Sequence, residues 1–195
     1  MIEKIIELDE QFFLFLNGLH TDSLDRIMYW ISEKYTWIPF YAVLLGFIIW
    51  RFKYKAVYIL LAIAFVILLA DQFTSSFMKP FFERFRPCHE PDLAGMVYLV
   101  EGCGGKFGFA SSHAANTFGL ATFIYLIFHK IYKHVGWLFL WALIVSYSRI
   151  YLGAHYPLDI LVGAGIGILI GWLVYLIMIK LAFKNSPSNL YAPGK

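Results

Sequence analysis

The sequence predicts an all-α integral membrane protein, a bundle of helices that crosses the bilayer several times. Of the 195 residues, 60% are hydrophobic, 19% are aromatic and 15% are charged, and the mean hydropathy is +0.66. An ordinary soluble domain carries about 25% charged residues, so this chain has too few polar side chains to cover a water-facing surface. Its net charge of +3 is too small and too dispersed for a nucleic-acid-binding surface, and we expect no nucleic-acid partner.

Five apolar runs are the candidate membrane-spanning helices, because a helix needs about 20 residues to cross a hydrocarbon core of about 30 Å. They cover approximately residues 36–50, 56–78, 112–128, 135–152 and 158–179. Lys and Arg near the ends of spans gather on the cytoplasmic side of a membrane. If all five runs cross, three basic segments share that side: 51–55, 130–133 and 180–195. The segments 79–111 and 152–158 then face the periplasm or the cell exterior.

The first 35 residues do not form a clean span, because charged side chains interrupt them. Among these are Glu3, Glu7, Asp9, Glu10, Asp22, Asp25 and Arg26. Apolar residues nevertheless recur at helical spacing, from Ile5 and Leu8 to Phe12, Phe15 and Leu16, which favours an amphipathic helix in the outer interface. The alternative is a sixth, weak span with a cytoplasmic N-terminus. We expect one domain over residues 1–195, with an interfacial region at 1–35 and a polar cytoplasmic tail at 185–195.

Three glycines line one face of the last predicted span. Gly163, Gly167 and Gly171 are each four residues apart, a spacing that lets two membrane helices approach closely. Packing within one bundle is the preferred interpretation. A contact between two copies of the chain along these glycines is the alternative, so an oligomer is allowed but not required.

Cationic and imidazole side chains gather on the predicted outward side, where the usual charge distribution would not place them. The set comprises Lys79, Arg84, Arg86, His89, Lys106, His113, Arg149, His155 and Asp159. One Lys or Arg near the end of a span extends its charge to the headgroups. A whole set that includes a His-x-x-x-Asp segment points instead to a phosphate site, because guanidinium and ammonium groups match phosphate oxygens in charge and geometry.

Three segments carry this chemistry in order along the chain. The first runs from Lys79 to Arg86-Pro87, the second is Ala110-Ser111-Ser112-His113, and the third runs from Ser148-Arg149 through His155 to Asp159. Together they resemble the signature of the type 2 phosphatidic acid phosphatase superfamily, which is Lys-x6-Arg-Pro, Pro-Ser-Gly-His and Ser-Arg-x5-His-x3-Asp. The resemblance covers about residues 55–180. It departs from the pattern where Ala110 replaces Pro and Ser112 replaces Gly.

The resemblance implies a role for each matching residue. His155 is the implied nucleophile, which forms a phosphohistidine, and Asp159 orients its imidazole. His113 is the implied general acid and later the base that activates water. The implied phosphate-binding residues are Lys79, Arg86, Arg149, Ser111 and Ser112. The resemblance implies no metal and no cofactor.

Several other polar residues lie outside this pattern. Arg84 and His89 lie near the expected pocket but are not expected to bind substrate. His129 and His134 belong to the inner basic cluster, where headgroup contacts are expected. Asp71, in the second span, is expected to pair within the bundle.

The two cysteines, Cys88 and Cys103, both lie in the predicted outward segment. Thiols in an oxidising compartment are expected to join, and a bridge that closes about 15 residues contributes about 3 kcal/mol in the chain-entropy model. The alternative is a metal site at Cys88-His89-Glu90.

The predicted protein is a metal-independent membrane phosphatase of the bacterial inner membrane with its active site on the outer face. Its partners would be membrane lipids and a lipid phosphate or diphosphate substrate, with undecaprenyl diphosphate or a phospholipid monoester preferred and lipid A phosphate among the candidates. The rival interpretation is a protein that binds lipid phosphates without turnover. The presence of both His113 and His155 argues against this rival, because binding alone needs neither.

Overall fold

The computed structural model describes residues 2–191, and the secondary structure of this part is helical, with no β-strand. The α-helices are α1 (Ile2–Asn17), α2 (Asp22–Ser32), α3 (Ile38–Phe52), α4 (Ala56–Gln72), α5 (Lys79–Phe82), α6 (Ser112–Phe128), α7 (Trp137–Tyr151), α8 (Pro157–Ala182) and α9 (Pro187–Tyr191). A π-helical stretch, Phe73–Met78, continues α4 into α5. The helices α3, α4, α6, α7 and α8 occupy the five predicted apolar runs.

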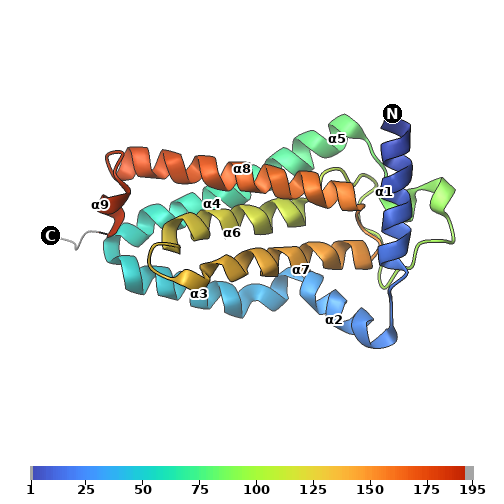
Figure 1. Ribbon diagram of the computed structural model, residues 1–195, viewed down its shortest axis with the longest axis horizontal. Helices are drawn as coiled ribbons and strands as arrows, with labels where there is room; N and C mark the ends of the chain where they lie inside the picture. The colour runs from blue at the N-terminus through green and yellow to red at the C-terminus, as the bar shows by residue number, and fades with distance from the viewer. Residues whose placement is uncertain (1, 192–195) are drawn as a thin grey trace.

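These long helices lie side by side along the long axis of the molecule (Figure 1). Segments 53–55 and 129–136 lie at one end together with α9, and we call this the basic end. Segments 83–111 and 152–156 lie at the opposite end, which we call the α1 end because α1 lies across it. Two stretches, Lys34–Phe82 and Pro157–Ala182, contain helix long and apolar enough to cross a membrane.

Helix α6 is the central helix, in contact with α4, α7 and α8. Its closest approach is to α8, where glycines of α8 lie against the backbone of α6. The pairs are Gly163 with Ser111, Gly167 with Ala115 and Gly171 with Gly119. A Cβ at any of these glycines would collide with a carbonyl oxygen of α6. The glycine face is therefore filled within the chain, which leaves it closed to a second copy.

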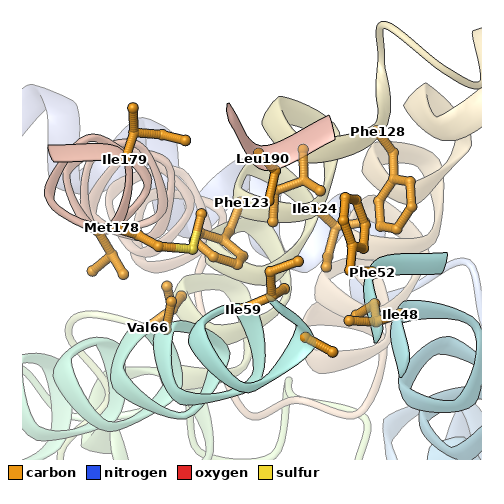
Figure 2. Packing of buried hydrophobic residues seen from close by; sticks show 14 of the residues in the cluster. Ile48, Phe52, Ile59, Val66, Phe123, Ile124, Phe128, Met178, Ile179 and Leu190 are labelled. Carbon is orange, nitrogen blue, oxygen red and sulfur yellow. The ribbon is translucent and has the colours of Figure 1, made fainter. Parts of the chain in front are cut away.

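The main apolar core lies toward the basic end (Figure 2). Side chains of α4, α6 and α8, among them Ile59, Phe123 and Met178, pack together there. The expected polar tail is part of this core, because Leu190 of α9 is only 1% exposed and the Tyr191 hydroxyl donates to the carbonyl oxygen of Ile127 at 2.6 Å. One apolar side chain and one hydroxyl fix the last turn to the bundle, which composition alone did not predict. Residues 192–195 of the tail lie outside the described part.

Helix α1 lies across the end of the bundle rather than alongside the other long helices (Figure 1). Its buried face is the i, i+4, i+8 stripe of Asp9, Phe13 and Asn17, whereas apolar residues such as Leu8 and Phe12 point outward and are exposed. This orientation suits a helix in the membrane interface, with its apolar face available to lipid. The Asn17 amide fixes the helix by donating to the carbonyl oxygens of Tyr98 and Tyr151 at 3.0 and 2.9 Å.

Candidate active site

All three sequence segments of the predicted site meet at the α1 end of the bundle. Lys79 begins α5 at the end of the long α4 extension, and Arg86 lies in the loop that follows. Ser111 caps α6, and His113 is in the first turn of that helix. Arg149 is in the last turn of α7, His155 is in the loop after it, and Asp159 is in the first turn of α8. Antiparallel helices thus bring residues 80 positions apart in sequence to the same end.

His155 and Asp159 form a buried pair. The Nδ1 atom of His155 lies 3.3 Å from Oδ2 of Asp159, and the two side chains are 2% and 0% exposed. The same Asp159 oxygen accepts the backbone N–H of Tyr156 at 3.1 Å and so caps α8. Since Nδ1 is held by the carboxylate, the imidazole keeps its proton on that side and its Nε2 lone pair faces away from Asp159.

Gly108 lets the 104–109 segment pass directly over this pair. A Cβ at position 108 would lie 3.1 Å from Oδ2 of Asp159 and 3.5 Å from Nδ1 of His155. A carbon 3.1 Å from Oδ2 would press on the carboxylate that holds the imidazole. Glycine at this position therefore allows the loop to exclude water from the His155–Asp159 contact.

Three cations of the predicted site have neutral partners. The Lys79 ammonium donates to the Ser112 hydroxyl at 3.1 Å, Arg86 Nε donates to the Phe107 carbonyl at 3.3 Å, and Arg149 donates to the Ser32 hydroxyl. Within residues 2–191 none of the three forms a salt bridge. The Nε atom of Arg149 is also buried and lacks a hydrogen-bond partner in this described part. Cations that are partly removed from water and form no salt bridge are costly, so this arrangement is suited to an anion.

The cations act on His155. Burial lowers the pKa of His155 well below its ordinary value, and the positive charges of Arg86, Arg149 and Lys79 lower it further. Burial also lowers the pKa of Arg86, although the Asp159 carboxylate opposes this shift. His155 is therefore neutral near pH 7, which is the form that carries a nucleophilic lone pair.

His113 lies in the same electrostatic environment, since the charges of Arg149, Lys79 and Arg86 and the imidazole of His155 all act on it. The structure thus brings both predicted histidines to one cluster of cations. Ser111 and Ser112 have local partners. The Ser111 hydroxyl accepts from the Ala114 N–H at the α6 N-terminus, at 3.5 Å, and Ser112 accepts from Lys79.

Arg84 and Asp9 belong to the site, although the sequence placed Arg84 near the pocket without a role and gave no role to Asp9. Arg84 donates to Oδ1 of Asp159 at 3.0 Å and to Oδ2 of Asp9 at 2.7 Å. Arg84 is near Arg86 in sequence but outside the recognised pattern, and Asp9 was one acidic residue among several in the N-terminal helix. Nothing in the linear sequence connects Asp9 with a partner 75 residues later.

The remaining candidates lie outside the three motif segments. Cys88 and Cys103 are joined as a disulfide with their Cα atoms 6.0 Å apart. The ligand atoms of His89 and these two cysteines lie within 4.8 Å of one another, and the bridge takes both thiols. Glu90 is not in that group. His129 lies at the basic end, where its Nδ1 is 3.0 Å from the Tyr125 carbonyl oxygen.

Comparison with known proteins agrees with the three sequence segments. Residues 55–182 match the model of the PAP2 superfamily. The chain is 43% identical to the lipid A 4'-phosphatase of Bacteroides thetaiotaomicron over all of its own length and 87% of that protein. It is 41% identical to the lipid A 4'-phosphatase of Porphyromonas gingivalis over 89% of this chain and 74% of that protein. An undecaprenyl-diphosphatase of Sulfolobus acidocaldarius is 28% identical over 89% of this chain and 79% of that protein.

Two solved structures share the fold. LpxE of Aquifex aeolicus is 29% identical, with a TM-score of 0.62 over 84% of this chain and 92% of that one. A transmembrane PAP2-type phosphatidylglycerolphosphate phosphatase of Bacillus subtilis is 22% identical, with a TM-score of 0.69 over 91% of this chain and 88% of that one. The chain thus shares its all-helical fold with membrane phosphatases of this family. Hydropathy had predicted a helical membrane protein, and the three motifs had predicted the phosphatase. This chain belongs to the PAP2 superfamily and is a lipid phosphatase.

Proposed function

We propose that this lipid phosphatase hydrolyses a phosphate monoester on lipid A by way of a phosphohistidine at His155. The observation that carries the proposal is the set of three partly buried cations without a salt-bridge partner in the described residues, Lys79, Arg86 and Arg149, whose charges all act on the neutral His155. Such a set can neutralise the oxygens of a phosphoryl group as it transfers. The buried, unpartnered Nε of Arg149 supplies a donor for one of those oxygens.

In the first step, the Nε2 lone pair of His155 attacks phosphorus, and the bond from phosphorus to the lipid oxygen breaks. The negative charge of the bound phosphate offsets the cations around His113 and favours its protonated form. His113 gives its proton to that oxygen, so the lipid leaves as an alcohol. The positively charged phosphorylated imidazole that forms is stabilised by Asp159, whose carboxylate accepts a hydrogen bond from Nδ1–H. The product of this step is a phosphohistidine with the phosphoryl group among the three cations.

In the second step, water attacks the same phosphorus. His113, now neutral, takes a proton from this water, and the bond between phosphorus and Nε2 breaks with its electron pair returning to His155. Inorganic phosphate leaves, and both histidines regain their starting protonation. No metal enters either step, so we expect activity to survive chelation.

The substrate is inferred from the relatives of greatest similarity reported above. Both lipid A 4'-phosphatases are more than 40% identical to this chain, whereas the undecaprenyl-diphosphatase is 28% identical. Undecaprenyl diphosphate, one of the two substrates that we expected from the sequence, is therefore the second candidate. The same two-step chemistry serves an anhydride, in which a phosphate replaces the alcohol as leaving group.

We also infer the placement of the protein in the bacterial inner membrane. Helices α3, α4, α6, α7 and α8 would cross the bilayer as one domain spanning residues 1–195, with α1 in the outer interface. The basic end carries Lys53, Lys130 and Lys184, which the distribution of positive charge places in the cytoplasm. The active site at the opposite end would then face the periplasm.

Purified protein in detergent tests the function directly. We expect phosphate release from lipid A to exceed release from undecaprenyl diphosphate, phosphatidate and phosphatidylglycerophosphate. Mass spectrometry of the lipid should show the loss of the phosphate at position 4'. Activity should persist in EDTA and be inhibited by vanadate, which imitates the five-coordinate transition state. Faster phosphate release from undecaprenyl diphosphate would overturn the assignment of lipid A as the substrate. Loss of activity in EDTA, with recovery on adding a divalent cation, would overturn the metal-independent mechanism.

A further inference from the structure

Arg84 differs from the other cations of the active site because its charge is already matched. Its two terminal nitrogens form separate ion pairs, one with Asp159 at 3.0 Å and one with Asp9 at 2.7 Å. Lys79, Arg86 and Arg149 have no such partner within residues 2–191. A guanidinium held between two carboxylates attracts a phosphate much less than a guanidinium held by a hydroxyl. Arg84 therefore does not belong with the phosphate-binding cations.

The surroundings of the Arg84 guanidinium fix its position. The Arg84 side chain is 19% exposed, and the two carboxylates are 7% and 0% exposed. The guanidinium also lies over the ring of Tyr156, 4.0 Å from its centroid. A planar guanidinium can bridge two carboxylates and stack on a ring at the same time, which a lysine ammonium cannot do. These contacts fix where Oδ1 of Asp159 lies.

Fixing Oδ1 also fixes the other oxygen, because the carboxylate is rigid. The Oδ2 atom of Asp159 is the atom that holds Nδ1 of His155 at 3.3 Å. Asp9 contributes twice, since its Oδ1 accepts the Leu158 N–H at 2.9 Å while its Oδ2 accepts from Arg84. The interfacial helix α1 is thereby attached to the first turn of α8, the turn that carries Asp159.

We infer that Arg84 and Asp9 are positioning residues for the nucleophile, acting through Asp159 on His155. The inference rests on the proposed function, in which His155 attacks phosphorus. The chain of contacts runs from Asp9 to Arg84, Asp159 and His155 and links α1 to the reacting imidazole. Helix α1 is therefore part of the catalytic apparatus, in addition to its contact with the membrane interface.

The test compares Arg84→Gln, Arg84→Lys and Asp9→Asn with Glu3→Gln, a matched control that removes an exposed carboxylate from the same helix. Arg84→Gln should lower kcat by about 10–100-fold, the range typical for loss of a group that orients a catalytic ligand, with KM within about threefold of wild type. Arg84→Lys should recover part of this loss. Asp9→Asn should act in the same direction, and the double variant with Arg84→Gln should be no worse than Arg84→Gln alone. Glu3→Gln should leave kcat unchanged.

The pH profile separates positioning from a general effect on folding. The charged or titratable groups that act on Asp159 include Arg84, Arg86, Asp9 and His155. Removing the positive charge of Arg84 disfavours the ionised carboxylate, so the acid limb of kcat should move to higher pH in Arg84→Gln and stay in place in Glu3→Gln. Helical circular dichroism and elution volume in detergent establish that each variant is folded, and the isosteric Asp9→Asn serves if Arg84→Gln does not fold.

Nitrogen NMR of histidine-labelled protein in detergent tests the inference without turnover. Wild type should show His155 with its proton on Nδ1, and Arg84→Gln and Asp9→Asn should show a mixture of tautomers. An unchanged tautomer together with unchanged kcat in both variants would overturn the inference. A raised KM with unchanged kcat in Arg84→Gln would also overturn it, because Arg84 would then bind the substrate phosphate. A wild-type protein that hydrolyses no phosphate lipid contradicts the proposed function alone, since the NMR comparison still decides the positioning role.

Discussion

At the scale of single residues, both a carboxylate and a group of cations act on the imidazole of His155. Asp159 holds its Nδ1 side within a buried contact, and the charges of Arg86, Arg149 and Lys79 keep the ring neutral. A phosphoryl group that entered would bring negative charge to those cations and make the imidazolium easier to form. In the proposed mechanism, the same charges keep His155 unprotonated before attack and stabilise the phosphoryl group afterwards.

Replacement of the nucleophile should separate catalysis from binding. His155→Ala should lower phosphate release by at least about 10²–10⁴-fold, the loss expected for a proton-transfer group alone, because the covalent step disappears. Binding of the substrate lipid, measured without vanadate as the rise in Tm that the lipid produces, should stay near wild type because the three cations remain. Turnover within tenfold of wild type would contradict the assignment of His155 as the nucleophile.

The sequence predicted which residues the structure brings together at this scale, but not the contacts that support them. The spacing within three short segments predicted His155, His113, Asp159 and the three motif cations. The sequence placed Arg84 near the pocket but did not predict its contact with Asp9, since that contact spans 75 residues and depends on α1 lying across the bundle. Folding decides which acidic residue of α1 faces inward, and the pattern of charges alone does not.

At the scale of elements, the α6–α8 contact sets the geometry of the site. His113 is in the first turn of α6, and Asp159 is in the first turn of α8. The Ser111 N–H also donates to the Asp159 carbonyl oxygen at 3.0 Å. A shift of one helix along the other would therefore move His113 away from His155. The glycines of α8 make the close approach possible.

A methyl group in this contact should destabilise the protein. Gly167→Ala places a Cβ against the Ala115 carbonyl oxygen, and we expect a loss of about 1–3 kcal/mol, as for other overpacked interiors, seen as a lower Tm in detergent. Gly165→Ala is the matched control, because nothing lies within 4 Å of its added Cβ. Its Tm should stay the same or rise, since alanine favours helix. Equal melting of the two variants would contradict the close contact of α6 with α8.

The loop between the first two motifs is a second element with a defined role. Its Cys88–Cys103 bridge closes a separation of 15 residues, which corresponds to about 3 kcal/mol in the chain-entropy model. A double Cys→Ser variant should lose thermal stability and keep near-normal turnover at low temperature, because neither cysteine belongs to the three phosphate-site motifs. Two alkylatable thiols in non-reduced protein from an oxidising compartment would argue against the bridge.

At the scale of the whole molecule, hydropathy predicted the five long helices and their up-and-down order. Hydropathy did not predict how the C-terminal segment packs. The 185–195 segment looked like a plain polar tail, yet Leu190 is buried and the Lys55 ammonium donates to the Asn189 carbonyl oxygen at 2.6 Å. Contacts of this kind depend on which groups the bundle leaves open at its end, and local composition does not contain that information.

The placement of the two ends relative to the membrane is testable in intact cells. Lys53, in the segment between α3 and α4 at the basic end, and Lys106, in the segment before α6 at the α1 end, are both exposed. Single cysteines at these positions, in a background that lacks Cys88 and Cys103, should react differently with an impermeant reagent. We expect labelling at 106 and protection at 53, because positive charge keeps the basic end in the cytoplasm. Labelling at 53 alone would invert the proposed topology.

The most direct test of the central claim is to trap the covalent intermediate. Protein mixed with a phosphate-labelled lipid substrate and quenched in alkali, which preserves phosphohistidine, should carry the label on the peptide that contains His155. His113→Ala should both gain and lose this label more slowly than wild type, because His113 acts as the acid in the first step and as the base in the second. His155→Ala should carry no label. Rapid phosphate release with no label on the protein, or with label on a residue other than His155, would contradict the proposed mechanism.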